Sequence, residues 1–219
     1  MVAIVAGNGL GLERSSALVL GSRAQLGSSS LGRANESVYV NAANGNLILT
    51  NRDEVLIGRG PDSFINRTYN SQGWLDDENG DNWRISTHRR VYGLTGTLNQ
   101  VGSTVRRVDW DGSNVKYQWN GISYVSTAGS GPYDIITRAD TNTATPWIWT
   151  DGDSQFSERY DNANGGRITE RRDTERDSSG NPTNKIIYGY DASGRLNRVT
   201  TADGNFTDLV WDNTAGQDQ

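Results

Sequence analysis

The densest group of residues able to do chemistry is an acidic turn before residue 82. It carries Asp76, Asp77, Asn79 and Asp81 around a glycine. Oxygen ligands gathered in a turn are what a hard cation such as calcium prefers. The spacing differs from that of an EF-hand loop, because no glutamate closes it at the twelfth position. We therefore interpret the segment as a solvated acidic turn. A weak calcium site formed by these four residues is the alternative.

The other candidates for catalysis do not form a recognisable catalytic set. His88 is the single histidine, and no nucleophile elbow accompanies it. The paired carboxylates, Asp109 with Asp111 and Asp151 with Asp153, stand at expected hairpin tips, where an aspartate caps its own turn. A glycosidase would instead need two carboxylates that face each other across a cleft. The sequence therefore predicts that the protein is not an enzyme, with no catalytic residue and no cofactor beyond the calcium alternative.

Seven tryptophans are the most ambiguous candidates for binding. Exposed aromatic rings stack on sugar rings, which makes Trp74, Trp83 and Trp119 candidate glycan contacts. The alternative is that the tryptophans pack as cross-strand pairs on one sheet face. We favour packing, because each tryptophan stands at a repeat-equivalent or strand-centre position.

These side chains belong to a chain that is organised by a recurring hairpin unit. The clearest copy spans residues 188–204, where aromatic and β-branched residues alternate with polar ones, as a half-buried strand requires. Turn chemistry follows the first aspartate, and the closing Asp-Gly pair is a strong hairpin signal. Seven residues define this copy: Tyr190, Asp191, Gly194, Arg195, Leu196, Asp203 and Gly204.

The unit recurs along the chain. An earlier copy runs from Tyr160 and Asp161 to Gly166 and Arg167. The apolar run at 209–211 is expected to be the strand that opens a further copy. Self-similarity at intervals of roughly 20–30 residues indicates a repeat architecture.

The remaining sequence predicts hairpins as well. Turns are expected at Asn44-Gly45 and at Asp111-Gly112, and residues 55–57 are expected to pair with residues 64–65 in a separate hairpin. Charges compensate each other in the run 167–177, which is typical of an exposed strand and loop. The predicted fold class is all-β, built from antiparallel hairpin repeats.

Composition excludes several classes of protein. A net charge of −5 and an isoelectric point near 4.9 argue against nucleic-acid binding. No apolar run approaches the roughly 18 residues of a membrane-spanning helix, so this segment is not expected to insert into a membrane. The start lacks a basic region, so no cleavable signal peptide is visible. The absence of cysteine excludes disulfides and thiolate metal sites.

The motifs resemble those of the YD-repeat family, also called Rhs repeats. Residues 158–212 resemble consecutive repeats, and residues 38–74 resemble the opening of an Rhs core, where an Asn-Gly-Asn strand leads to an Arg-Thr-Tyr-Asn-Ser strand. The resemblance implies part of a YD-repeat β-sheet shell with three regions. These are a Gly/Ser-rich leader or docking segment at 1–36, an Rhs-core opening region at 37–157, and YD repeats at 158–219 with the last one incomplete.

The function implied by the resemblance is structural. The chain would be a segment of a bacterial shell that encapsulates a carboxy-terminal toxin or other cargo in the full-length exported protein. Its partners would be the remainder of the same shell or that toxin, and its location would be secreted or at the cell surface. The alternative is a glycan-binding or adhesion module that binds a cell-surface glycan through exposed tryptophans.

Overall fold

The computed structural model describes residues 2–5, 9–12, 25–26, 36–73, 81–126 and 133–211. These residues form seventeen β-strands and no helix, which confirms the all-β prediction. The strands pair antiparallel in two sheets, apart from one parallel pair near the amino terminus. Within this described part, no helix is long and apolar enough to cross a membrane.

The first sheet has six strands in the order β2-β1-β3-β4-β5-β6. Their bounds are β1 Ala3–Val5, β2 Gln25–Leu26, β3 Ser37–Asn41, β4 Leu47–Leu56, β5 Ser63–Asn70 and β6 Trp83–Ile85. The predicted turn at Asn44-Gly45 joins β3 to β4, with Gly45 at φ 78°. The pairing expected between residues 55–57 and 64–65 is confirmed, since Val55 pairs with Phe64 across the turn. The two expected hairpins nevertheless share one long strand, because β4 runs from Leu47 to Leu56 through a bulge between Arg52 and Glu54.

The second sheet has eleven strands, and each one pairs with the next in the chain. The first part comprises β7 Arg90–Thr95, β8 Thr104–Val108, β9 Asn114–Trp119, β10 Tyr124–Ser126, β11 Ile135–Thr137 and β12 Trp147–Thr150. The second part comprises β13 Ser157–Tyr160, β14 Ile168–Arg172, β15 Lys185–Tyr190, β16 Leu196–Thr200 and β17 Phe206–Asp208. The predicted hairpin across Asp111-Gly112 joins β8 to β9, with Gly112 at φ 86°.

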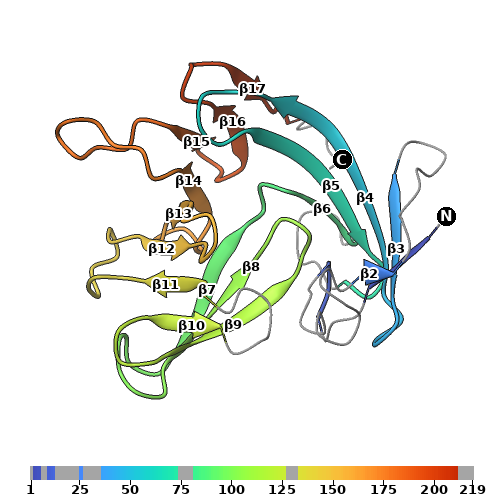
Figure 1. Cartoon of the computed structure of the whole chain (residues 1–219), viewed down its shortest axis with the longest axis horizontal. Coiled ribbons are helices and arrows are strands. Elements are labelled where there is room, and N and C mark those ends of the chain that lie inside the picture. The colour runs from blue at the N-terminus through green and yellow to red at the C-terminus, as the bar shows by residue number, and fades with distance from the viewer. Residues whose placement is uncertain are drawn as a thin grey trace.

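Strands β7 to β14 close into a ring (Figure 1). The amide of Val91 donates to the carbonyl of Gly166 at 2.8 Å, and the amide of Ile168 donates to the carbonyl of Arg89 at 3.2 Å. Gly166 has φ 74°, and a Cβ there would overlap the backbone of Val91. The ring encloses an aliphatic and aromatic core: Val91, Val105, Val115, Tyr117, Tyr124, Ile136, Trp147, Trp149, Tyr160 and Ile168.

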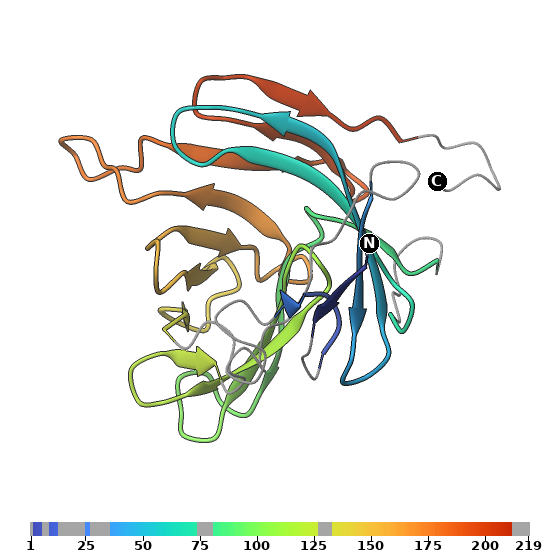
Figure 2. The same cartoon turned by 45° about the vertical axis from the view of Figure 1, so that its right-hand side comes forward.

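Strands β15 to β17 continue past the ring and lie beside β4 and β5 (Figure 2). Ile65 of β5 packs with Ile186, Leu196 and Val199, which forms a second and smaller core. The amide of Arg59 also donates to Oδ2 of Asp203 at 2.6 Å. The two sheets are therefore held together by contacts between residues more than a hundred positions apart.

The described part of the predicted leader is built into the fold. Strand β1 lies between β2 and β3 and runs parallel to β3. The amide of Gly11 donates to Oδ1 of Asn70 at 2.8 Å, and the amide of Leu12 donates to Oδ2 of Asp111 at 2.6 Å. This segment therefore bridges the first sheet and the β8–β9 turn. The predicted boundaries of the three regions remain predictions.

The carboxy-terminal edge differs from expectation. Strand β17 ends at Asp208, and residues 209–211 form no strand, so the predicted apolar strand there is wrong. The chain instead continues alongside β16. The amide of Leu209 donates to the carbonyl of Asn197 at 3.0 Å, and the indole of Trp211 donates to the carbonyl of Leu196 at 2.7 Å. These two bonds take the place of a strand ladder.

Candidate functional site

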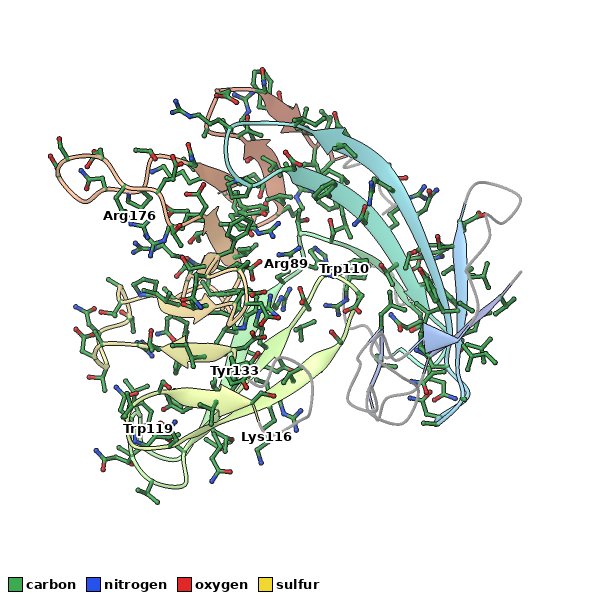
Figure 3. The ribbon with its side chains drawn as sticks, in the orientation of Figure 1. Arg89, Trp110, Lys116, Trp119, Tyr133 and Arg176 are labelled. Atoms are coloured by element: carbon green, nitrogen blue, oxygen red, sulfur yellow. The ribbon has the colours of Figure 1, made fainter. Side chains whose placement is uncertain are left out.

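A pocket of about 350 Å³ lies between the ring and the first sheet. Strands β4 and β5, the loop between them and the segment that follows β6 contribute Arg52, Asp62, Phe64, Asn66, Ser86, Thr87 and Arg89. The second sheet and its loops contribute Arg107, Asp109, Trp110, Trp149, Asp151, Phe156, Glu158, Arg171 and Tyr188. Figure 3 shows Arg89 and Trp110 at the centre of the molecule, whereas Trp119 and Arg176 lie at its periphery.

The floor of the pocket is a buried ion cluster centred on Glu158 of β13, whose side chain is 1% exposed. Arg107 Nη2 donates to Glu158 Oε2 at 2.7 Å, and Arg89 Nη1 donates to the other carboxylate oxygen. The hydroxyl of Tyr160 donates to Glu158 Oε2 and accepts from Arg107 Nε at 2.9 Å. A carboxylate is thus held between two arginines and a phenol, with both of its oxygens bonded.

Asp109 and Trp149 complete the surroundings of Arg107. The guanidinium of Arg107 bonds to Asp109 Oδ2 at 3.1 Å, and Arg89 lies 3.6 Å from Asp109 Oδ1. The Cζ of Arg107 lies 3.8 Å from the centre of the Trp149 ring. The Trp149 indole donates in turn to the hydroxyl of Tyr117 at 3.1 Å. Two cations therefore bond to two anions, and a third cation, Arg171, lies 4.0 Å from Glu158 Oε1.

Burial and charge oppose each other in setting the ionisation of this cluster. Burial alone would raise the pKa of Glu158, but the neighbouring Arg89 and Arg107 outweigh it and lower that pKa well below its usual range. The pKa of Asp109 is lowered for the same reason. Burial raises the pKa of Tyr160 well above its usual value. At neutral pH the carboxylates are charged and the phenol is neutral, so the cluster holds charge in place and offers no group poised for proton transfer.

The acidic turn and its calcium alternative fall largely outside the described residues. Asp76, Asp77 and Asn79 lie there, and Oδ1 of the described Asp81 accepts from the amide of Trp83 at 2.9 Å. Among the residues that the structure describes, no group of three or more His, Cys, Asp or Glu side chains is arranged to hold a metal ion. The calcium site stays a prediction.

The paired carboxylates separate into two roles. Asp111 Oδ1 accepts from the amide of Ser113 at 3.0 Å, and Asp151 Oδ1 accepts from the amide of Asp153 at 2.9 Å. This confirms the interpretation of Asp111 and Asp151 as turn caps. Asp109 departs from it, because the side chain also turns into the ion cluster and bonds to Arg107.

The repeat motif forms a hairpin in both copies, and the loop of the first copy is two residues longer. The amide of Asp161 donates to the carbonyl of Arg167, and the amide of Asp191 donates to the carbonyl of Arg195, both at 2.8 Å. In each copy the strand shows a register shift just before its tyrosine, Tyr160 or Tyr190. Gly194 adopts φ 84° in the turn, as its place in the motif predicts, and Gly204 adopts φ 81° in the turn that closes the unit.

Consecutive copies are linked by a pair of contacts that recurs. The guanidinium of Arg167 lies 4.0 Å from the ring centre of Tyr190, and the Tyr190 hydroxyl donates to the carbonyl of Ile168 at 2.6 Å. One copy later, Arg195 lies 5.5 Å from the ring centre of Trp211. The Trp211 indole then donates to the carbonyl of Leu196, as described above. Each arginine therefore stacks on the aromatic residue of the next copy, and that residue bonds to the carbonyl just after the arginine.

The candidate glycan contacts lie away from the pocket lining. The Trp83 ring centre lies 5.4 Å from that of Tyr69, and the Trp119 ring centre lies 5.2 Å from that of Tyr124. Both arrangements are aromatic pairs between neighbouring strands of the kind that packing favours. Trp74 lies outside the described residues. Binding of a glycan by these tryptophans stays a prediction.

Sequence reasoning missed most of the pocket. Glu158 stands two residues before Tyr160, so strand alternation places both side chains on one face. That signal could have revealed a carboxylate turned towards the core. Arg171 was assigned to an exposed run of mixed charge, yet its side chain is only 25% exposed and lines the pocket. No local pattern could have joined Arg89 and Arg107 to Glu158, because they come from distant strands and loops.

Comparison with known families gives one match. A family described as a domain of unknown function, DUF6531, matches residues 38–117. The match extends from β3 through the first sheet and into β9 of the ring, and it contributes Arg89, Arg107 and Asp109 to the ion cluster. No curated protein matches the chain at a significant level.

Proposed function

We propose that this chain is a structural segment of a bacterial Rhs/YD-repeat shell. In the full-length exported protein, the shell would encapsulate a carboxy-terminal toxin or other cargo. The observation that carries this proposal is the recurring contact between copies, Arg167 with Tyr190 and Arg195 with Trp211. A contact that each copy makes with the next is suited to a wall that grows by adding copies.

The sheet has an edge at which such growth can continue. Among the described strands, β17 pairs only with β16, so one side of β17 carries main-chain groups available to another strand. Trp211 already lies against β16 beyond the end of β17. We infer that the remainder of the same shell is the partner of this edge, and that the shell interior receives the toxin.

The chemistry of the pocket supports a structural function over a catalytic one. Glu158 and Asp109 are paired with arginines that lower their pKa values, whereas general acid–base catalysis uses a group whose pKa lies near neutrality. We therefore propose that the segment has no enzymatic activity of its own. Secretion, or display at the bacterial cell surface, is the location that this function requires.

Electron cryomicroscopy of the natural full-length product tests the proposal. We expect a hollow particle whose wall contains residues 83–211 and whose strands continue from β17. A solid or elongated particle, or one in which β17 remains an outer edge, would overturn the shell assignment.

A matched pair of variants tests the contact between copies within that product. Arg167→Leu combined with Arg195→Leu removes both stacking cations, and we expect the enclosed cargo to become sensitive to added protease. Arg106→Leu is the control, since Arg106 is exposed on β8, whose neighbours in the sheet are β7 and β9. Equal protection of the cargo in all three proteins would contradict a role for the contact in closing the wall.

A further inference from the structure

We propose that the pocket and an adjoining hollow form one groove that binds a carboxylated oligosaccharide. Trp110 is its stacking platform, and Arg52 and Arg171 are its carboxylate-binding groups. This function is separate from the building of a shell wall. It also uses residues other than the outer tryptophans that the sequence singled out.

The groove is elongated. The adjoining hollow has a volume of about 450 Å³. It is lined by Leu12, Ser37, Tyr39, Thr50, Asn51, Arg52, Asn66 and Trp110. Arg52, Asn66 and Trp110 line both hollows, so the two meet at these residues. A ligand with several linked units fits this shape better than a single compact molecule does.

The lining matches the surface of a sugar. A sugar ring has an apolar face of C–H bonds, which packs on an aromatic ring, and a rim of hydroxyls, which bond to amides and hydroxyls. Aromatic rings and small polar side chains both line the groove, among them Tyr39, Asn51, Trp110 and Phe64. Polar capacity also remains unused, because Oδ1 of Asn66 and Oγ1 of Thr87 are buried without a hydrogen-bond partner in the described structure.

Two of the four pocket arginines remain available for a ligand. Arg89 and Arg107 are bonded to Glu158 and Asp109 in the floor. By contrast, the guanidinium groups of Arg52 and Arg171 donate no hydrogen bond within the described residues. Each rests against a phenylalanine, with Arg52 Cζ 5.0 Å from the Phe64 ring centre and Arg171 Cζ 5.5 Å from that of Phe156.

These two arginines come from opposite walls, β4 and β14, and face the same pocket. Arg171 has a distant ionic neighbour, since its Nε lies 4.0 Å from Glu158 Oε1. Asp62 and Asp151 also line the pocket, and both are engaged in their own turns. A planar guanidinium held on an aromatic ring is ready for a bidentate bond to a carboxylate. The open cations therefore favour an acidic sugar over a neutral one.

An extended peptide fits this groove less well. Peptides that bind along a sheet usually add a strand to a free edge and bond through the main chain. The groove is instead lined by β4 and β5, and each of these strands already has a neighbour on both sides. Recognition here falls to side chains, which suits a ligand that presents hydroxyls and a carboxylate.

Isothermal titration calorimetry on the whole chain tests the proposal with two acidic probes, a trimer of galacturonic acid and 3′-sialyllactose. Their neutral counterparts are the methyl ester of the trimer and lactose. We expect at least one acidic probe to bind, and to bind about tenfold or more tightly than its neutral counterpart, since a charge-assisted hydrogen bond is lost with the carboxylate. Binding of neither acidic probe would overturn the proposal, as would equal affinity for the neutral forms.

Variants locate the binding. We expect Trp110→Ala, Arg52→Gln and Arg171→Gln each to lower the affinity for the acidic probe about tenfold or more. Trp119→Ala and Arg106→Gln, which lie away from the groove, should leave its affinity unchanged. Circular dichroism and the unfolding midpoint confirm that each variant is folded.

Loss of affinity in Trp119→Ala alone would place the site elsewhere and overturn the groove. A tri-glutamate peptide that binds as tightly as the sugars would overturn the sugar assignment. None of these outcomes bears on the shell wall, which the particle images test separately.

Discussion

Tyr160 and Tyr190 occupy the same position in two copies of one motif, yet their surroundings differ. The Tyr160 hydroxyl lies in the buried ion cluster, where it bonds to Glu158 and Arg107. The Tyr190 hydroxyl bonds to a main-chain carbonyl, and its ring is covered by Arg167. The first copy is therefore fixed by side chains of the ring, whereas the second is fixed by the copy before it.

The difference shows that the first copy of the repeat is anchored to the ring, whereas a later copy is anchored to the copy before it. The contact between Tyr190 and the preceding copy uses a carbonyl and an arginine that every copy can supply, so it can be repeated. The contact of Tyr160 needs Glu158 and an arginine from β8, so it occurs where the repeats join the ring. The charges in that junction are buried. Loss of the Tyr160 contact should therefore lower the free energy of unfolding far more than loss of a contact between later copies.

The largest effect is expected for Glu158→Gln. The change leaves Arg89 and Arg107 buried with one anion, Asp109, and removal of one partner from a buried ion pair costs about 3–5 kcal/mol of the free energy of unfolding. Urea denaturation, monitored by tryptophan fluorescence, measures this loss of unfolding free energy. Glu54→Gln on β4 is the matched control and should change little. Equal midpoints for the two variants would show that the cluster does not stabilise the ring.

Closure of the ring is tested by Gly166→Ala. Gly166 has φ 74°, and the added Cβ would overlap the Val91 backbone, so we expect a loss of about 2–4 kcal/mol from strain and displacement together. Gly204→Ala is the control, since it has a similar φ with no atom within 4 Å of the added Cβ. Its loss should be limited to the backbone strain of about 1–2 kcal/mol. If thermal unfolding gives the same loss for both, the contact between Gly166 and β7 is not what closes the ring.

Acid should weaken the ring through the same carboxylate. The pKa of Glu158 is lowered in the folded chain, so its contribution to stability is present above the unfolded pKa of about 4.3 and is lost as the pH falls below that value. We expect the unfolding midpoint of the natural chain to fall between pH 5 and about pH 3, and that of Glu158→Gln to fall less. Parallel slopes in the two proteins would contradict the assignment of this pH dependence to Glu158.

A smaller effect is expected for Arg167→Ala in the contact between copies. The change removes the stack on Tyr190 and a bond of 2.9 Å to the carbonyl of Gly194, and a cation–π contact at a partly exposed site contributes about 1 kcal/mol. Hydrogen exchange should speed up in β15 and β16 while the ring stays protected. Faster exchange in β8 and β9 as well would mean that the two regions unfold together.

The smallest effect is expected for Asp208→Asn at the outer edge. Asp208 bonds to Arg198 at 2.5 Å, but both side chains are more than two-fifths exposed, so water and salt screen the pair. We expect no measurable change in the unfolding midpoint. A shift as large as that of Arg167→Ala would mean that β17 contributes more to the repeat region than its exposure indicates.

The sequence by itself determined the hairpins. Alternating side chains, Asp-Gly and Asn-Gly pairs and the motif from Tyr190 to Gly204 act between residues a few positions apart. Strand pairing and positive φ at Gly45, Gly112 and Gly194 followed from them. The packing of Trp83 and Trp119 in pairs with Tyr69 and Tyr124 was also predictable from the sequence. Most of the candidate site was not, because its lining comes from strands and loops far apart in the chain.

The tertiary structure alone decided how the hairpins are arranged. The ring closes between Val91 and Gly166, and the ion cluster joins Arg107 to Glu158 across 51 positions of the chain. Alternation fixes which face of a strand a side chain occupies, and it carries no information about which distant strand will lie opposite that face. The choice of partner depends on sheet curvature and on the joint burial of charges, which exist only once the whole chain has folded.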